Sequence, residues 1–495
     1  MKEFIPHISK LLDGVIGGLS FLLPEFVLTL TFLLSIGCGL LFRGKPMINW
    51  WVTVIGILLS GWFAYSQIAF PATSPIFFGM ILPDTNGAWL KLLIGFTCLL
   101  FCFFVYYSQQ LRNHPKRIDD LLGILLGVHI GLNLMAVAVN WLMVYLTIEM
   151  VSVGSYVMVG YLARDRKQSE AAMKYVLFGT VCSAVMLYGL SLLYGYSGGL
   201  SFVDRTQLTA LLEMPPLVFI VATFFVLTGI GFKLSFVPFH FWSPDVYQGA
   251  PTPVTAFLST APKIGAIALL GRLVIAWSTV METGLPQLLF YILAGIAIGS
   301  MLLGNLAAIR QRQVKRMMAY SSIGHTGFLI MIVLAISQQT FPVLFFFLVS
   351  YIMMNVGVFM FADYLEEHLG ITTVTEYQGL GKSYPMLMVA MTVLMVSLTG
   401  LPPTVGFIAK LLSFSAVMEA YQHNHSLSWL LLLITGAVTT VMALFFYFKI
   451  PLNAFLRERK REFPPLAYNG LAVLAILLSL MSLVLGFYPS LLGAF

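Results

Sequence analysis

Charged side chains are scarce in this sequence. Only 9% of its 495 residues are Asp, Glu, Lys or Arg, whereas 59% are hydrophobic. In a soluble globular domain about a quarter of the residues are charged, so this composition excludes that class. We therefore expect an integral membrane protein.

Cysteine is scarce too, with four residues in the chain, namely Cys38, Cys98, Cys102 and Cys182. All four fall in hydrophobic segments, and none stands in the set of ligands that a zinc or iron–sulfur site requires. The sequence also lacks a Gly-rich phosphate-binding loop and a Ser-His-acid arrangement typical of hydrolases. We therefore expect no cofactor, no metal, and no redox or ATP chemistry on this chain.

Long hydrophobic runs dominate what is present. A membrane-spanning helix needs about 20 apolar residues, and about fourteen runs meet that length. They lie at 20–43, 50–69, 88–108, 118–137, 141–163, 169–196, 216–236, 253–275, 286–307, 313–335, 341–362, 386–414, 427–448 and 466–487. This pattern predicts an all-α polytopic membrane protein and not a barrel.

Basic residues indicate how these helices are oriented. Lys and Arg gather in cytoplasmic loops, and with both termini outside, eighteen fall in the inner loops and three in the outer ones. The inner set is Arg43, Lys45, Arg112, Lys116, Arg117, Arg164, Arg166, Lys167, Arg310, Arg312, Lys315, Arg316, Lys382, Lys449, Arg457, Arg459, Lys460 and Arg461; the outer set is Lys2, Lys10 and Arg205. The basic balance therefore reflects topology and does not indicate a nucleic acid partner.

Six basic residues remain inside the hydrophobic segments: Lys91, Lys174, Lys233, Lys263, Arg272 and Lys410. Lys91 and Arg272 lie near segment ends, where long side chains can extend to the lipid headgroups. A lysine at the centre of a lone membrane helix costs about 2.5–3.5 kcal/mol. We therefore expect the other four lysines to face the interior of the bundle.

Among the acidic residues we place only Glu25 and Glu149 within hydrophobic segments, and Glu25 lies near an outer end. A carboxylate placed like Glu149 needs a cation or a proton. Lys174 on the next segment is its natural partner. A static structural pair is one alternative, and extension of Lys174 to the headgroups is another.

Proline interrupts the chain between Lys233 and Lys263, where Pro238, Pro244, Pro251 and Pro253 preclude one continuous helix. A second break, at Gly400, Pro402 and Pro403, precedes Lys410. Broken helices at membrane depth line ion pathways in transporters, and five helices per unit would make adjacent copies inverted.

The two breaks, each with a nearby buried lysine, echo one another and suggest two related five-helix units. We predict an N-terminal three-helix segment (1–117), two inverted five-helix repeats (118–275 and 286–450) and a C-terminal helix (451–495). His325, within a segment between the two breaks, is a candidate proton relay, although a hydrogen-bonded core histidine is an equal alternative. His240 borders the first break, and His129 is also intramembrane.

Five strings carry a resemblance over residues 20–487: LPEFVLT (23–29), KYVLFGTVCSAVMLYGLSLLYGYSG (174–198), FKLSFVPFHFWSPDVYQGAPTPVTAFLSTAPKIGA (232–266), AYSSIGHTGFL (319–329) and SLTGLPPTVGFIAKLLSF (397–414). They resemble the subunit N family of the proton-pumping NADH:quinone oxidoreductase, respiratory complex I. The short chain after the last segment argues against the larger antiporter-like subunit of that complex.

The resemblance implies a role for each buried charge. Glu149 and Lys174 would form the charged pair of a first half-channel, with Lys233 as its central protonatable lysine. Lys263 and His325 would belong to the hydrated chain that joins the halves, and Lys410 would end the second half. The second half has no buried carboxylate that matches Glu149, as expected for subunit N.

The same resemblance implies that protons move when quinone reduction elsewhere in the complex shifts charge along these residues. FMN, iron–sulfur clusters and quinone would sit in partner subunits, and the neighbours would be other antiporter-like subunits and membrane lipid. We expect a bacterial inner membrane, because no transit peptide precedes the first segment.

Two other functions stay open from the sequence. An independent or Mrp-like Na⁺/H⁺ antiporter would use the same charges without a redox partner. A passive scaffold would use its lysines only to bind neighbouring subunits.

Overall fold

The computed structural model describes residues 15–42, 46–113, 118–162, 166–279, 284–337, 340–458 and 463–492. Within these ranges the regular elements are helices, and the only β pairings are isolated bridges. The all-α prediction is confirmed. The amphipathic N-terminal stretch lies outside the described residues, as do Lys2, Lys10, Arg43, Lys45, Lys116, Arg117, Arg164, Arg459, Lys460 and Arg461.

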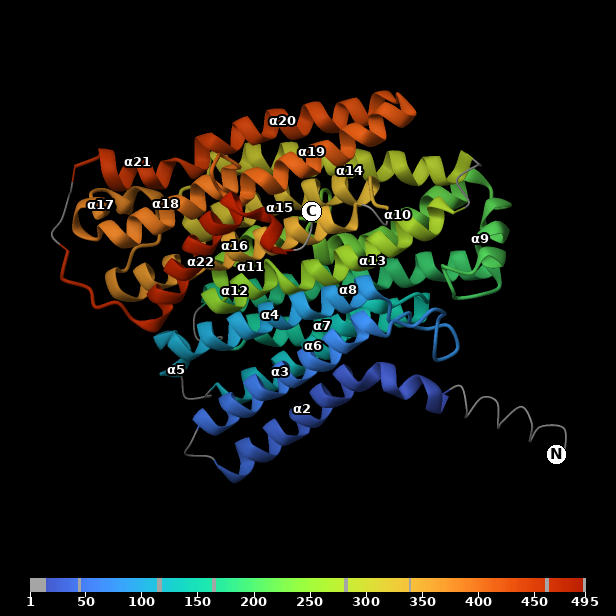
Figure 1. Cartoon of the computed structure of the whole chain (residues 1–495), viewed down its shortest axis with the longest axis horizontal. Coiled ribbons are helices and arrows are strands. Elements are labelled where there is room, and N and C mark those ends of the chain that lie inside the picture. Colours follow the sequence, from blue (N-terminus) through green and yellow to red (C-terminus); the bar gives the residue numbers. More distant parts are fainter. Residues whose placement is uncertain are drawn as a thin grey trace.

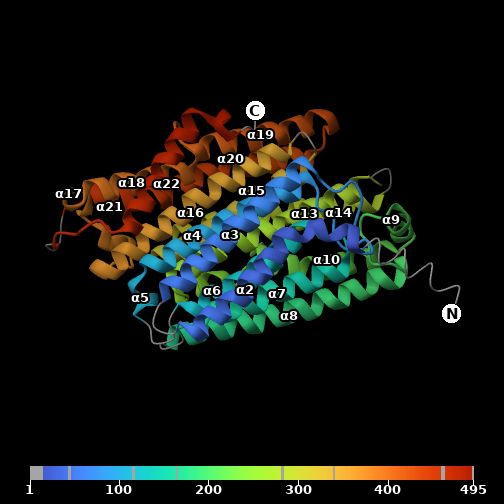
Figure 2. The same cartoon turned by 60° about the horizontal axis from the view of Figure 1, so that its bottom comes forward.

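The helices of the N-terminal half lie side by side in approximate chain order, as the colours of Figures 1 and 2 show. Within the predicted three-helix segment, the short 3₁₀ helix η1 (Leu19–Leu22) leads directly into the first long helix. The helices that follow are α2 (Leu23–Leu41), α3 (Pro46–Ala69), α4 (Thr85–Tyr107), α5 (Gln109–Arg112), α6 (Asp119–Val137), α7 (Trp141–Val159), α8 (Arg166–Ser197), α9 (Arg205–Leu212) and α10 (Pro216–Leu234).

The C-terminal half adds its helices on the other side of the molecule (Figure 1). They are α11 (Trp242–Gly249), α12 (Thr252–Leu258), α13 (Ala261–Ser278), α14 (Gly284–Ile309), α15 (Val314–Leu334), α16 (Phe341–Leu369), α17 (Leu380–Ser383), α18 (Pro385–Thr399), α19 (Val405–Asn424), α20 (Leu427–Tyr447), α21 (Lys449–Leu456) and α22 (Gly470–Phe487). Two further 3₁₀ turns are η2 (Val374–Tyr377) and η3 (Pro489–Leu492).

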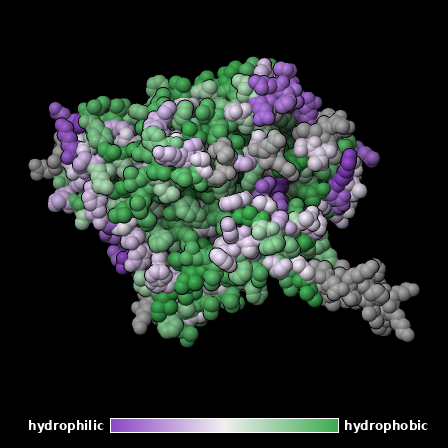
Figure 3. Space-filling model, viewed as in Figure 1, coloured by the Kyte–Doolittle hydropathy of each residue, from purple (hydrophilic) through white to green (hydrophobic). Residues whose placement is uncertain are grey.

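Thirteen helical spans of the described chain are long and apolar enough to cross a membrane. The fourteenth predicted crossing, 386–414, is two helices in the structure. The shorter apolar helix α18 ends at Thr399, and α19 begins at Val405. Hydrophobic residues cover most of the face shown in Figure 3, and hydrophilic residues gather toward its two ends, as expected for a membrane-spanning bundle.

Both breaks leave carbonyl groups at a helix end inside the bundle, where they need donors. Helix α10 ends at Leu234, and Ser235 follows in the left-handed conformation with φ 56°. Trp242 Nε1 donates to the Phe232 carbonyl at 3.1 Å, and Thr326 Oγ1 donates to the Leu234 carbonyl at 3.0 Å. The first break is therefore held by side chains from elsewhere in the fold.

Lys91 corrects the prediction that it extends to the headgroups. It is 2% exposed and pairs with Glu25 at 2.6 Å, with Gln67 Oε1 at 3.3 Å from the same ammonium. Lys91 stays inside because an acid on another helix meets it there. Arg272 is partly buried and pairs with the partly exposed Asp84 at 2.5 Å, so extension of Arg272 to the headgroups stays a prediction. The Glu25–Lys91 pair joins α2 to α4, and Gln67 brings in α3.

The buried Glu25–Lys91 pair predicts a characteristic pattern of stability. Loss of one partner of a buried pair costs about 3–5 kcal/mol, whereas replacement of both by neutral groups is often tolerated. Lys91→Met and Glu25→Gln should each lower the midpoint of thermal unfolding of the purified assembly, and the double variant should lie closer to the parent. A double variant whose loss equals the sum of the two single losses would show that the pair contributes nothing.

Candidate functional site

Lys263 lies near the start of α13 and is 1% exposed. Its ammonium donates to the Ser322 carbonyl at 3.0 Å, to Ser322 Oγ at 2.7 Å and to Thr326 Oγ1 at 2.8 Å. An ammonium has three N–H donors, so these three acceptors on α15 satisfy it fully. The site is therefore built to hold the charged form of this lysine.

Hydroxyl groups extend outward from Lys263 in two directions. Ser322 Oγ lies 2.7 Å from Tyr351 Oη, which donates to the Ser259 carbonyl at 3.0 Å. Thr326 Oγ1 donates to the Leu234 carbonyl, next to Lys233 in the chain. Hydrogen bonds thus connect α10, α13, α15 and α16 around one lysine.

His325 follows on the same helix and is 5% exposed. Its Nε2 lies 3.2 Å from Tyr447 Oη at the end of α20, and the same hydroxyl bonds Ser321. The core-histidine alternative and the relay prediction agree with this geometry equally, because both require a hydroxyl partner. Sequence reasoning missed Tyr447 and Tyr351, although a tyrosine inside a hydrophobic segment is itself a signal of a buried hydroxyl.

The Lys410 ammonium binds the helix end at the second break. Its ammonium donates to the carbonyls of Leu398 at 3.2 Å and Thr399 at 2.9 Å, which are the free C-terminal carbonyls of α18. The negative end of the helix dipole also favours a cation there. Phe328 presents its ring 5.2 Å from the ammonium.

A small internal cavity lies between His325 and Lys410. Its volume is about 10 Å³, and its lining includes both of these side chains together with Asn305, Ser321, Thr439 and Tyr447. A cavity of roughly 10–15 Å³ holds about one water molecule when polar groups line it. A single water could therefore connect the histidine to the last lysine.

Lys233, at the end of α10, differs from the other buried lysines. It is 2% exposed, and its Nζ makes no hydrogen bond to any described residue. The rings of Tyr156, Tyr175 and Phe232 lie 5.8–6.0 Å from it. The charge of Glu149 acts on this ammonium, and the Glu149 Oε1 atom is itself buried without a described partner.

The predicted pair of Glu149 with Lys174 is not present among the described contacts. Lys174 instead binds Asp245 at 2.6 Å and Glu170 at 2.8 Å, with its side chain 38% exposed. Asp245 also binds Arg316 at 2.6 Å. Lys174 is close enough to its helix end to reach these acids, which border a cavity of about 200 Å³.

Asp245 is the acid that sequence reasoning missed in this group, because it stands inside the proline-rich break. It lies on α11, outside the candidate spans. Burial raises the pKa of Asp245, but hydrogen bonds from Lys174 and Arg316 and their positive charges outweigh it, so the pKa of this carboxyl lies below its usual range. Asp245 therefore joins α8 to α15 as an ionised group.

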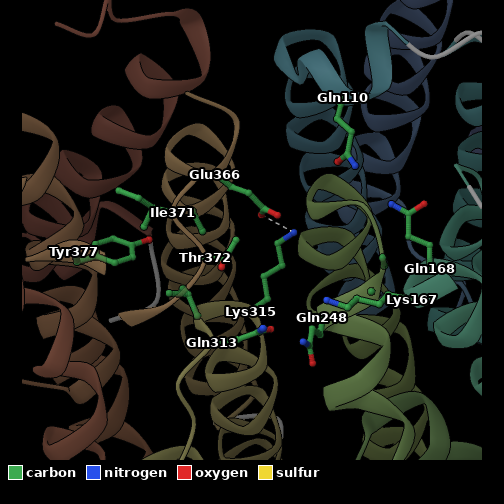
Figure 4. Close-up of a pocket in the computed structure, with 14 residues that line it drawn as sticks. Gln110, Lys167, Gln168, Gln248, Gln313, Lys315, Glu366, Ile371, Thr372 and Tyr377 are labelled. Carbon is green, nitrogen blue, oxygen red and sulfur yellow. Dashed lines mark ion pairs between the residues drawn. The ribbon is translucent and has the colours of Figure 1, made fainter. Parts of the chain in front are cut away.

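A larger polar cavity of about 270 Å³, which we call the vestibule, adjoins this group. Its lining includes Lys167, Gln248, Gln313, Lys315 and Glu366, and the dashed line in Figure 4 marks the Lys315–Glu366 ion pair at 2.7 Å. These residues come from or adjoin the loops that carry most of the basic residues. The vestibule therefore lies on the side of the membrane that we predict to be cytoplasmic.

Three further titratable residues are buried in the bundle. His240, beside the first break, is 4% exposed, and His129 on α6 is 1% exposed. Asp363 on α16 is 1% exposed. The expectation that only Glu25 and Glu149 lie within hydrophobic segments is therefore wrong. Helix α16 continues to Leu369, beyond the predicted segment end at residue 362.

Comparison with known proteins finds a matching family model and similar individual proteins. The family model for the membrane region of NADH:quinone oxidoreductase/Mrp antiporter proteins matches residues 138–443. "NADH-quinone oxidoreductase subunit N 2" of Chloroherpeton thalassium is 37% identical, over 91% of this chain and 88% of that protein.

Two solved structures share the fold. A chain of respiratory complex I from Thermus thermophilus is 27% identical, with a TM-score of 0.76 over 95% of this chain and 99% of that one. A chain of the Mrp complex from Dietzia sp. is 18% identical with a TM-score of 0.78, over 96% of each chain. The second likeness concerns the fold alone.

The second break predicts a strict need for glycine at position 400. Gly400 has φ +83°, and an added Cβ would lie 2.7 Å from Lys410 Cδ. A non-glycine residue in this left-handed region costs about 1–2 kcal/mol, so Gly400→Ala should lower the thermal stability of the assembly and displace the Lys410 ammonium from its carbonyl acceptors. Gly295→Ala on α14 is the matched control, since no atom lies within 4 Å of its added Cβ. Equal stability of the two variants would refute this account of the break.

Proposed function

This chain belongs to the NADH:quinone oxidoreductase/Mrp antiporter membrane family, and on that premise we propose that it is the proton-translocating subunit N of a NADH:quinone oxidoreductase. The observation that carries the proposal is that two buried hydrogen-bonded groups lie on the same helix, α15: Ser322 and Thr326 bind Lys263, and His325 bonds Tyr447 beside the cavity that Lys410 also lines. The rings of His325 and Tyr351, one from each group, lie 5.4 Å apart. The two lysines on either side are residues that the bilayer would otherwise disfavour.

Each buried group would take part in a different step of proton transfer. Lys233, without a described acceptor, and Lys263, with three, differ in how well the protein stabilises their charged forms. A proton would pass from Lys233 to Lys263 along the Thr326 side, then through His325 and Tyr447 to Lys410. Each hydroxyl would accept one proton and give up another, so no net charge would remain on it.

Charge at the first half-channel would drive these transfers. Lys174 has acids on two sides, with Asp245 and Glu170 bound here and Glu149 on the adjacent helix. A shift of Lys174 toward Glu149 would change the repulsion between Lys174 and a proton on Lys233. Quinone reduction in partner subunits would supply that shift through neighbouring membrane subunits, and FMN and iron–sulfur clusters would sit in those partners.

We further infer the arrangement of the chain in its membrane. The two breaks, each with a lysine near a helix end, support two five-helix repeats at 118–275 and 286–450. The basic loops support cytoplasmic placement of the vestibule and outer placement of both termini in a bacterial inner membrane. An Mrp-like antiporter is the alternative, because its fold is the same. Purification separates the two, since the proposed subunit should co-isolate with flavin and iron–sulfur subunits.

If the proposed function is right, Lys263 is needed for proton pumping by the complex and not for assembly of the complex. Lys263→Met should reduce NADH-driven proton uptake several-fold in liposomes that contain the assembled complex, because no ammonium would remain between Lys233 and His325. Lys382→Met is the control, since Lys382 is exposed on α17 and should pump as the parent does. If Lys263→Met lowered the amount of assembled complex but left uptake per complex intact, the scaffold function would replace this one.

A further inference from the structure

The carboxylate of Asp363 is the buried charge that the pathway above does not use. The residue is 1% exposed on α16, and its Oδ2 atom has no hydrogen-bond partner among the described residues. A buried charge is normally paired or neutralised. A carboxyl with one free oxygen in such a place is a candidate to bind and release a proton.

The charged neighbours of Asp363 are engaged elsewhere. Lys315 and Glu366 act on its carboxyl electrostatically, but they bind each other at 2.7 Å. Glu367 accepts hydrogen bonds from Ser108 Oγ at 3.0 Å and from the Gln110 backbone N–H at 2.9 Å. Asp363 is therefore left without a cation of its own among the described contacts.

Water can approach Asp363 from the vestibule. Ala362, its neighbour in the chain, and Glu366, one helical turn further on, both line this cavity. Figure 4 shows Glu366 reaching Lys315 within it. Because roughly 10–15 Å³ of such volume holds about one water molecule, a volume of about 270 Å³ has room for several. The vestibule thus reaches to within about one helical turn of the buried Asp363 carboxyl.

On the inner side, a group of buried hydroxyls leads from Asp363 toward Lys263. Thr252, at the start of α12, lies close to Asp363. Tyr247 packs its ring 6.4 Å from that of Phe359, one turn before Asp363 on α16, and lies close to Ser322. Ser322 in turn receives the hydrogen bond of Lys263.

The hydroxyls of Thr252 and Tyr247 share one further property. Both are buried, and neither makes a hydrogen bond of normal geometry to a described residue, although Thr252 lies near Asp363 and Tyr247 lies near Ser322 and Ser243. Buried polar groups in proteins are almost always partnered, by protein or by ordered water. These two hydroxyls are therefore available to water, and such water would connect the carboxyl to Ser322 and Lys263.

We propose that Asp363 is a proton-uptake residue, which loads protons from the vestibule and passes them through Thr252 and Tyr247 to Lys263. Water in the vestibule protonates the carboxylate. The carboxylic acid then gives its proton to the hydroxyl and water chain, each member of which accepts one proton and releases another. The neutral amine of Lys263 takes the last proton and becomes the ammonium that Ser322 and Thr326 hold, and Asp363 returns to its carboxylate.

This inference rests on the proposed function, and the test uses the assembled complex in liposomes. Asp363→Asn keeps the size of the side chain but cannot carry a proton, so NADH-driven proton uptake should fall several-fold. Asp363→Glu should restore a large part of it. Glu419→Gln, at an exposed acid on α19, is the control and should leave uptake unchanged.

Infrared difference spectra between the resting and the turning-over complex distinguish a proton-carrying role of Asp363 from a purely structural one. The parent should show a carboxyl C=O band that appears and disappears with turnover, and Asp363→Asn should lose it. Parental uptake by Asp363→Asn would overturn the proposal, as would loss of uptake with an unchanged spectrum. If Lys263→Met abolishes uptake and Asp363→Asn does not, the proposed function stands and only the role of Asp363 falls. If neither variant changes uptake, the proposed function falls as well.

Discussion

Two of the buried ammonium groups in this bundle are held by neutral acceptors, which the backbone of a continuous helix seldom supplies because its carbonyls are already bonded. The second break releases the carbonyls of Leu398 and Thr399 to Lys410. The first break ends α10 just after Lys233 and frees the Leu234 carbonyl for Thr326, which also accepts from Lys263. The irregular backbone thus holds Lys410 directly, whereas hydroxyl groups on the continuous helix α15 hold Lys263, and one of them is anchored at the first break.

The buried cations of the described chain fall into two kinds. Lys91 and Arg272 each meet an acid at 2.6 and 2.5 Å, and such pairs fix neighbouring helices relative to one another. Lys233, Lys263 and Lys410 have no acid in direct contact and are held instead by carbonyls, hydroxyls or aromatic rings. Neutral partners stabilise a charge less firmly than a carboxylate does, and the proposed pathway uses only lysines of the second kind.

The sequence was sufficient to predict the helical class, the breaks and the lysines that the bilayer would exclude. It was not sufficient to predict their partners. Lys174 binds Asp245, 71 residues away, and not the acid of the preceding helix. Tyr447 meets His325 across 122 residues. Packing alone decides such contacts. Asp363 escaped notice because the predicted segment ended at 362, one residue before it, whereas α16 continues to Leu369. The two repeats and the roles of individual residues stay predictions.

The central claim is that protons cross between the two breaks by way of Lys263, His325 and Lys410. An experimental density map of the assembled complex that resolves water molecules tests it most directly. The account predicts ordered water in the cavity between His325 and Lys410, and hydrogen-bonded contact from there back to Lys263 without an apolar gap. A dry, apolar layer that separates these lysines in both the resting and the turning-over complex would contradict it.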